Sequence, residues 1–207
     1  MVLTDKIKNI IFDFGGVIIN IDHDLTAKAF MELGVTDFEE KYSQLSQTDL
    51  FNDFETGRIT PEEFRKRIRE HIPGKVTDSW IDKAWAAMIL DIPSERIALL
   101  KEVRKKYRIF LLSNTNAIHY DIFLADLQKR YRYNNFADLF EKAYFSFQTG
   151  MRKPDLEIFE MVIKDNDLDP SETLYIDDSP QHIEGAKKAG LVTHYLEEGT
   201  DVIDVLI

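Results

Sequence analysis

Asp13 is the first residue of this chain whose type and position could support chemistry. It follows three apolar residues, 10–12, and a glycine pair, Gly15 and Gly16, comes just after it. A short apolar run that ends in a carboxylate and glycines is typical of a buried strand that stops at its carboxyl edge. Ligands of open α/β sheets bind at that edge, so Asp13 is a candidate for catalysis. Helix capping or turn formation is the alternative role that residue chemistry allows.

Three later segments carry further groups of this kind. One apolar run ends in Ser113 and Asn114, and another ends in the acidic pair Asp177 and Asp178. Between them, Lys153 stands before a proline at the entry of a helical pattern. A carboxylate nucleophile, a hydroxyl, a cation and an acidic pair suit a metal-assisted reaction on an anion. A plain strand-to-helix turn at Ser113 and an ordinary surface lysine at Lys153 are the alternatives.

In this order the segments resemble the motifs of the haloacid dehalogenase superfamily. That family has a nucleophilic Asp, a Ser or Thr, a Lys and an acidic pair, which are matched here by Asp13, Ser113, Lys153 and Asp177-Asp178. The surrounding segments look most like the small sugar-phosphate phosphatase branch, to which alpha-glucose-1-phosphate phosphatases belong. The resemblance implies a phosphatase that forms an aspartyl phosphate on Asp13.

The resemblance also implies a magnesium site. Mg²⁺ prefers oxygen ligands in octahedral geometry. Asp13 and Asp178 would each give one carboxylate oxygen, and the backbone carbonyl of Gly15 would be the third protein ligand. Asp177 would act behind these ligands or through water.

On the substrate side, the resemblance implies that Lys153 neutralises the nucleophile and a phosphate oxygen. Ser113, helped by Asn114, would donate a hydrogen bond to the phosphoryl group. The expected partner is therefore a small phosphorylated molecule.

Two positions depart from the family pattern. Most of its phosphatases carry a second Asp two residues after the nucleophile, as general acid and base, but this chain has Gly15 there. A well-placed general acid contributes about 10²–10⁴-fold. Asp22 or Asp24, a metal-bound water, or a leaving group that needs little help could compensate, although helix capping is an alternative role for both carboxylates. Many members also carry an acid where this chain has His182.

Length and composition limit the possible classes of protein. The 207 residues, 44% of them hydrophobic, suit one sizeable domain with a modest insertion. A net charge of −11 disfavours nucleic acid and anionic lipid as partners. The absence of cysteine excludes disulfides and thiol catalysis. No stretch approaches about 20 apolar residues, so we expect a cytoplasmic protein without a membrane partner, and a monomer by default.

Apolar runs and helical patterns alternate in the outer parts of the chain, which predicts an α/β fold with a Rossmann-like parallel sheet. Strands are expected at about 7–13, 107–113, 142–147, 172–177 and 191–196, and helices at 93–106, 116–132, 155–166 and 180–189.

The stretch from 22 to 92 has helix signals and no convincing strand. Thr60 to Glu63 form a predicted capping box, and two apolar stripes follow, one of them containing Trp80 and Trp85. In the family that the chain resembles, an insertion here is a helical cap over the active site. We therefore expect a catalytic core of residues 1–21 and 93–207 and a helical cap of residues 22–92.

Three functions stay open on this basis. The favoured one is a Mg²⁺-dependent phosphatase that acts on a small phosphorylated metabolite, most simply a sugar phosphate. A 2-haloacid dehalogenase would use Asp13 against carbon, and the missing acid suits that reaction, but the Asp177-Asp178 pair would repel its substrate. The third is a non-catalytic binding or regulatory protein of the same fold.

Overall fold

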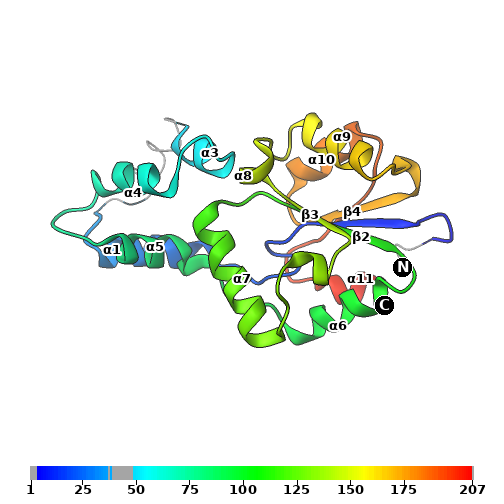
Figure 1. Cartoon of the computed structure of the whole chain (residues 1–207), viewed down its shortest axis with the longest axis horizontal. Coiled ribbons are helices and arrows are strands. Elements are labelled where there is room, and N and C mark those ends of the chain that lie inside the picture. Colours follow the sequence, from blue (N-terminus) through cyan, green and yellow to red (C-terminus); the bar gives the residue numbers. More distant parts are fainter. Residues whose placement is uncertain (1–3, 37, 39–48, 207) are drawn as a thin grey trace.

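The computed structural model describes residues 4–36, 38 and 49–206. Five parallel strands form one sheet in the order β3-β2-β1-β4-β5 (Figure 1). This confirms the predicted α/β class, and each observed strand lies within the run that predicted it. The strands are β1 (Asn9–Phe12), β2 (Arg108–Ser113), β3 (Lys142–Phe145), β4 (Thr173–Asp177) and β5 (Val192–Tyr195).

Successive strand residues point to opposite faces of the sheet, and here the residues on both faces are apolar. Each face is therefore buried under helices. In β1, Ile10 and Phe12 belong to one buried cluster, while Ile11 belongs to the other. The helices of the two faces are separated above and below the sheet in Figure 1. The first cluster includes residues of α6 (Ser94–Val103), α7 (Ala117–Tyr131) and α11 (Val202–Leu206), and the second includes residues of α9 (Leu156–Asp165) and α10 (Pro180–Lys188).

Local signals set the ends of these helices. The Asn116 side chain caps α7 by accepting from the backbone N–H of His119, at 3.1 Å. Gly190, with φ at +84°, follows the end of α10 as expected. Pro154 does not lie in the first turn of α9, because the helix begins at Leu156. Shorter elements complete the core: α8 (Ser146–Thr149) and the 3₁₀ turns η2 (Phe136–Asp138) and η3 (Pro170–Glu172).

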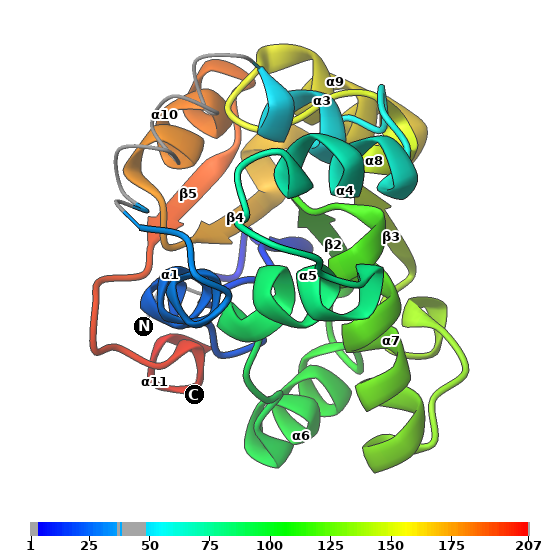
Figure 2. The ribbon, with the colours of Figure 1, turned by 90° about the vertical axis from the view of Figure 1, so that its left-hand side faces the viewer.

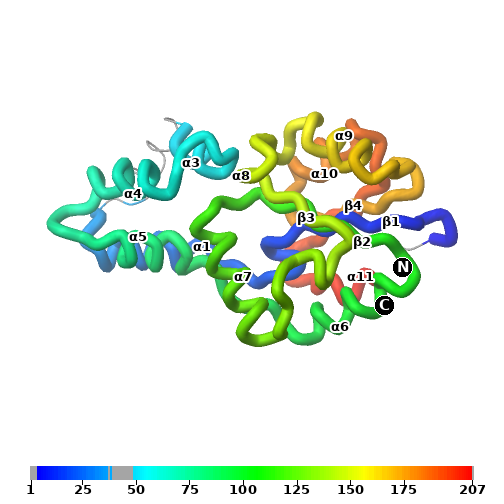
Figure 3. The backbone as a smooth tube through the Cα atoms, in the orientation of Figure 1, coloured from blue at the N-terminus to red at the C-terminus, as the bar shows by residue number. Residues whose placement is uncertain are grey.

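A separate group of helices stands beyond the carboxyl ends of the strands, as the tube in Figure 3 shows. Their apolar side chains form a third cluster, in which Phe54 and Phe64 stack with ring centroids 4.1 Å apart. Trp85 is buried in this cluster, but Trp80 is 53% exposed and is not part of it. The elements are α1 (His23–Glu32), α3 (Leu50–Glu55), α4 (Pro61–Arg69), α5 (Asp78–Trp85) and η1 (Ala86–Met88).

Two neighbouring connectors join this helical group to the sheet. The backbone N–H groups of Asn20 and Asp22 donate to the carbonyls of Asp91 and Met88, both at 2.9 Å. The N–H of Leu90 donates in turn to the carbonyl of Asn20 at 3.0 Å. Figure 2 views the group from its outer side, with the sheet behind it. We propose that residues 1–21 and 93–207 form the core and that residues 22–92 form the cap. Within the cap, residues 37 and 39–48 lie outside the described part of the chain. None of the described helices is long and apolar enough to cross a membrane.

Candidate active site

Apart from Asp22, the predicted site residues converge where the strand order reverses beside β1. The chain passes from β1 to β2 and β3 on one side, and then to β4 and β5 on the other, which makes the β1/β4 edge a topological switch point. A cavity of about 630 Å³ opens there, between the core and the cap. Among the residues that line it are Asp13, Gly15, Ser113, Asn114, Lys153 and Asp178 from the core, and His23, Asp24, Glu55 and Trp85 from the cap.

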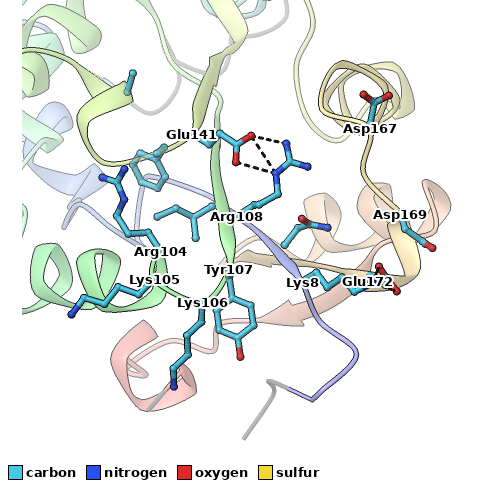
Figure 4. A pocket seen from close by; sticks show the side chains of 14 residues that line it. Lys8, Arg104, Lys105, Lys106, Tyr107, Arg108, Glu141, Asp167, Asp169 and Glu172 are labelled. Atoms are coloured by element: carbon cyan, nitrogen blue, oxygen red, sulfur yellow. Dashed lines mark hydrogen bonds and ion pairs between the residues drawn. The ribbon is translucent and has the colours of Figure 1, made fainter.

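A second cavity, of about 670 Å³, lies at the opposite edge, where the strands begin (Figure 4). Its charges largely satisfy one another. Arg108 and Glu141 point toward each other and form an ion pair at 2.6 Å, and Lys8 pairs with Glu172 at 2.8 Å. This is a surface network of ion pairs, so the candidate active site is the cavity at the switch point.

Lys153 is the centre of the site's charge. Its side chain is fully buried, and its ammonium group donates to Oδ1 of Asp13 at 2.6 Å and to Oδ2 of Asp177 at 2.8 Å. Burial alone would lower the pKa of Lys153, but the two carboxylates raise it above its ordinary value. The structure therefore keeps a cation directly beside the predicted nucleophile.

Asn114 has a structural role beside the one predicted for it. Its side chain amide donates to the backbone oxygen of Lys153 and accepts from the backbone N–H of Lys153, both at 2.9 Å. These two bonds hold the Lys153 backbone in place, and Asn114 also lines the cavity next to Ser113. Among the described residues, the hydroxyl of Ser113 makes only a 3.5 Å contact, with the carbonyl of Asn114, and Ser113 lines the cavity.

Asp13 keeps one carboxylate oxygen available. Among the described residues, its only side-chain partner is Lys153, which bonds Oδ1 and leaves Oδ2 unpaired. Burial raises the pKa of Asp13 to about 7; Lys153 opposes this rise, and the nearby charges of Asp177 and Asp178 add to it. Because Asp177 and Asp178 place two negative charges near Asp13, a further cation besides Lys153 would stabilise the ionised carboxylate of Asp13.

Asp177 has both oxygens occupied by donors. Oδ2 accepts from Lys153 and from the hydroxyl of Tyr175, while Oδ1 accepts from the backbone N–H of Ser179 at 2.7 Å and lies 3.0 Å from Nδ1 of His182. Burial alone would raise the pKa of Asp177, but Lys153 and His182 hold it well below its usual range. Asp177 thus orients Lys153 and is a poor candidate for a direct metal ligand.

The donor set fits a hard divalent cation. Asp13 and Asp178 each offer a carboxylate oxygen for direct coordination, and an oxygen of Asp177, which already accepts from other donors, lies within 4.8 Å of both. Desolvation and the charge of Asp177 raise the pKa of Asp178, as expected where acids gather without enough positive charge. Lys153 offsets only one of the three charges. Oxygen ligands and a net negative site are what Mg²⁺ prefers, and Gly15 lines the same cavity with its backbone.

Gly16 contributes to the site in a way that sequence reasoning did not detect. Its φ is +71°, and a Cβ built on it would lie 2.0 Å from Oδ2 of Asp178. The backbone of Gly16 therefore occupies space that any side chain would take from the predicted metal ligand. The glycine pair after Asp13 was the available signal.

Gly16→Ala is expected to weaken Mg²⁺ binding by about 10- to 100-fold, the usual effect of disturbing the surroundings of a metal ligand. Calorimetric titration with Mg²⁺ measures this. Gly199→Ala is the matched control, because Gly199 also has positive φ, at +81°, but no atom of the described residues lies within 4 Å of its Cβ position. Equal Mg²⁺ affinity in the two variants would show that Gly16 does not shape the metal site.

Asp22, a predicted site residue, does not line the cavity, whereas Asp24 does. The carboxylate of Asp22 instead caps α1 by accepting from the backbone N–H of Asp24 at 3.0 Å.

His119 lines the cavity, but sequence reasoning did not identify it as a candidate. Its Nε2 lies 3.0 Å from the carbonyl of Trp85, while burial lowers the pKa of His119 to about 4 and keeps the ring neutral.

Comparison with known proteins gives the family of the chain. A family model for haloacid dehalogenase-like hydrolases matches residues 7–190. D-ribitol-5-phosphate phosphatase of Bacteroides thetaiotaomicron is 35% identical over 195 residues, which cover 94% of each chain. The sesquiterpene phosphatase astK of Aspergillus oryzae is 26% identical, with 92% of this chain and 90% of that protein covered.

A crystal structure of a haloacid dehalogenase-family enzyme from Bacteroides thetaiotaomicron, in complex with magnesium and inorganic phosphate, is similar along nearly the whole chain. It has a TM-score of 0.87 and 39% sequence identity, and the match covers 97% of this chain and 100% of that one. The family match over residues 7–190 and these likenesses agree with the four ordered motifs, and the chain therefore belongs to the haloacid dehalogenase-like hydrolases.

Proposed function

We propose that the protein is a Mg²⁺-dependent phosphatase that hydrolyses the phosphate monoester of a small sugar or sugar alcohol. The observation that carries this proposal is the buried Lys153 ammonium, held between Asp13 and Asp177 with Asp178 beside them. The relative that is named for ribitol 5-phosphate and the similar structure that contains magnesium and phosphate support both the reaction class and the cation.

In the proposed reaction, Oδ2 of Asp13 attacks phosphorus, and the bond from phosphorus to the leaving-group oxygen breaks. The leaving oxygen takes up a proton from solvent water, and the alcohol departs; the water that attacks in the second step returns a proton to the solvent. A water molecule then attacks the phosphorus of the phosphoaspartate, which releases inorganic phosphate and restores the carboxylate of Asp13. Bound Mg²⁺ would neutralise charge on the phosphoryl group and hold it in line for attack.

Other residues of the site position the phosphoryl group. Lys153 would pair with one of its oxygens, and the free hydroxyl of Ser113 would donate to another. Gly15 has no side chain that could protonate the leaving oxygen. Of the two hinge carboxylates considered as substitutes, Asp24 lines the cavity and Asp22 caps α1 instead.

The dehalogenase alternative has less support. Its substrate is a carboxylate, which the cluster of Asp13, Asp177 and Asp178 would repel unless a cation were present. The non-catalytic alternative is disfavoured because the chain belongs to a hydrolase family and matches named phosphatases. The expectation of a cytoplasmic monomer stays a prediction.

A substrate screen tests the proposal. The purified protein is incubated with sugar phosphates, sugar-alcohol phosphates and 2-haloacids, each with Mg²⁺ and with EDTA. Release of phosphate from at least one ester, only with Mg²⁺, is the expected result. Halide release without any phosphatase activity would favour the dehalogenase instead.

The raised pKa of Asp13 predicts how Mg²⁺ binding depends on pH. A protonated carboxyl does not ligate Mg²⁺, so binding must displace the proton below a pH of about 7. The apparent Mg²⁺ affinity is expected to fall progressively as pH is lowered from 8 to about 5.5, and the Asp13→Asn variant should lack most of this dependence. Calorimetric titrations at several pH values measure it, and a flat profile for the wild type would contradict the assignment.

A further inference from the structure

Glu55 is a carboxylate that the cap adds to the wall of the active-site cavity. It is the last residue of α3 and lines the same cavity as Asp13, Ser113 and Lys153. Its side chain is 26% exposed. Glu55 has no part in the four motifs, and the proposed phosphoryl transfer does not use it.

Arg152 fixes one end of this carboxylate. Nη2 of Arg152 lies 3.1 Å from Oε2 of Glu55, and Nη1 donates to the side chain oxygen of Asn52, one turn earlier on α3. Oε2 is shielded from solvent, and no donor among the described residues makes a hydrogen bond to it. The ion pair therefore orients the carboxylate, and it links α3 to the segment that carries Lys153. Burial raises the pKa of Glu55, and Arg152 opposes this rise.

The other oxygen of Glu55 remains available. Within the part of the chain that the structure describes, no donor bonds Oε1, and it is not among the side-chain atoms that are buried without a partner. Since Oε2 is shielded and Glu55 lines the cavity, the exposed portion of the carboxylate presents Oε1 as an acceptor. A charged acceptor on a fixed carboxylate is a strong and directional partner for a hydroxyl group.

The position of Glu55 indicates which part of a substrate it meets. A phosphoryl group must lie against the core, beside Asp13 and Lys153, so the alcohol portion extends toward the cap. The cap also lines this space with the polar side chains of His23, Asp24 and Thr26 and with several apolar ones, Ala27, Trp85, Met88 and Ile89. Carbon atoms of the alcohol can pack against these, while a hydroxyl would satisfy Glu55.

We propose that Oε1 of Glu55 accepts a hydrogen bond from a hydroxyl of the leaving alcohol, and so selects phosphate esters of polyhydroxy compounds over those of plain alkyl or isoprenoid alcohols. This inference rests on the proposed phosphatase function and assigns a specificity-determining residue to it. An ester without hydroxyls would leave Oε1 of Glu55 desolvated and without a hydrogen-bond donor, and such a loss lowers kcat/KM strongly.

The test compares two esters of the same chain length, ribitol 5-phosphate and n-pentyl phosphate, with Mg²⁺ present. The wild type is expected to prefer ribitol 5-phosphate in kcat/KM by at least about 100-fold. Glu55→Leu should lower kcat/KM for ribitol 5-phosphate at least about tenfold and leave that for n-pentyl phosphate unchanged or raised. Glu55→Gln keeps an acceptor oxygen without the charge, so its ratio should lie between the two.

Asp53→Asn provides the matched control on the same helix. Asp53 is also an acid of α3, but it pairs with Arg58 and does not line the cavity. Its replacement should leave the preference between the two esters as in the wild type. Thermal unfolding tests whether each variant is folded. If Glu55→Leu does not fold, the test is the ratio of kcat/KM for ribitol 5-phosphate to that for n-pentyl phosphate in Glu55→Gln.

The outcomes separate this inference from the function on which it rests. If the wild type hydrolyses neither these esters nor any other phosphate monoester, the proposed function fails. If it hydrolyses both esters but Glu55 variants lower both rates equally, Glu55 is only structural and the inference is overturned. A wild type that prefers n-pentyl phosphate would also overturn it.

Discussion

Replacing Asp13 by asparagine is expected to lower kcat by at least about 10⁴-fold while the protein stays folded. The amide has nearly the same shape, but it cannot attack phosphorus and form a phosphoaspartate. The amide oxygen can still accept from Lys153, and Asp177 remains as the second partner of that ammonium at 2.8 Å. The packing around Lys153 should therefore persist.

Initial rates with the best ester from the screen, at saturating Mg²⁺, measure this effect. Circular dichroism and thermal unfolding confirm that the variant is folded. Asp121→Asn is the control, because Asp121 is an exposed acid on α7 that does not line the cavity. If Asp13→Asn retained more than a few per cent of wild-type kcat, on the scale of losses seen for nucleophiles, Asp13 would not be the nucleophile.

Lys153→Met is expected to damage both stability and turnover. Lys153 is fully buried, and removing it leaves Asp13 and Asp177 close together without their shared cation. Breaking a buried pair by removing one partner costs about 3–5 kcal/mol in the free energy of unfolding. Turnover should fall as well, because the phosphoryl group loses the ammonium that would neutralise one of its oxygens.

Chemical denaturation without metal measures the loss of stability, and initial rates measure the loss of turnover. Lys187→Met is the control, since Lys187 pairs with Glu184 on the surface of α10 and is 54% exposed. Such surface pairs contribute only about 0–1 kcal/mol. Mg²⁺ should restore part of the stability lost in Lys153→Met, because it also offsets the carboxylates. A Lys153→Met protein as stable and as active as Lys187→Met would contradict the role assigned to Lys153.

The sheet and the acids at its edge could be predicted because their causes are local. An apolar run that ends in Asp13, and others that end in Ser113 or Asp177, identify strand ends directly. Parallel strands then bring their carboxyl ends to one edge, so the residues meet without any further information. Lys153 was placed there by the order of the motifs, and the structure adds that it is completely buried between two carboxylates.

The rest of the site depends on contacts between elements that are distant in sequence. Nothing near Asn114 indicates that its amide would bond the backbone of Lys153, 39 residues away. The role proposed for Glu55 could not be predicted either, because it depends on an ion pair with Arg152, which is distant in sequence. A glycine is needed at position 16 because Asp178, at the end of β4, lies where a Cβ of residue 16 would be. Periodicity likewise could not tell Trp85, which is buried, from Trp80, which is not.

Phosphate release by metal-free protein, before and after Mg²⁺ is added back, tests the central claim most directly. The protein is stripped with EDTA, and ribitol 5-phosphate or the best ester from the screen is added, with the Asp13→Asn variant measured in parallel. We expect no release without metal, a saturable recovery as Mg²⁺ is titrated, and none at any Mg²⁺ concentration in Asp13→Asn. Release at the full rate in excess chelator, or from Asp13→Asn with Mg²⁺, would contradict a Mg²⁺-dependent phosphatase built on this site.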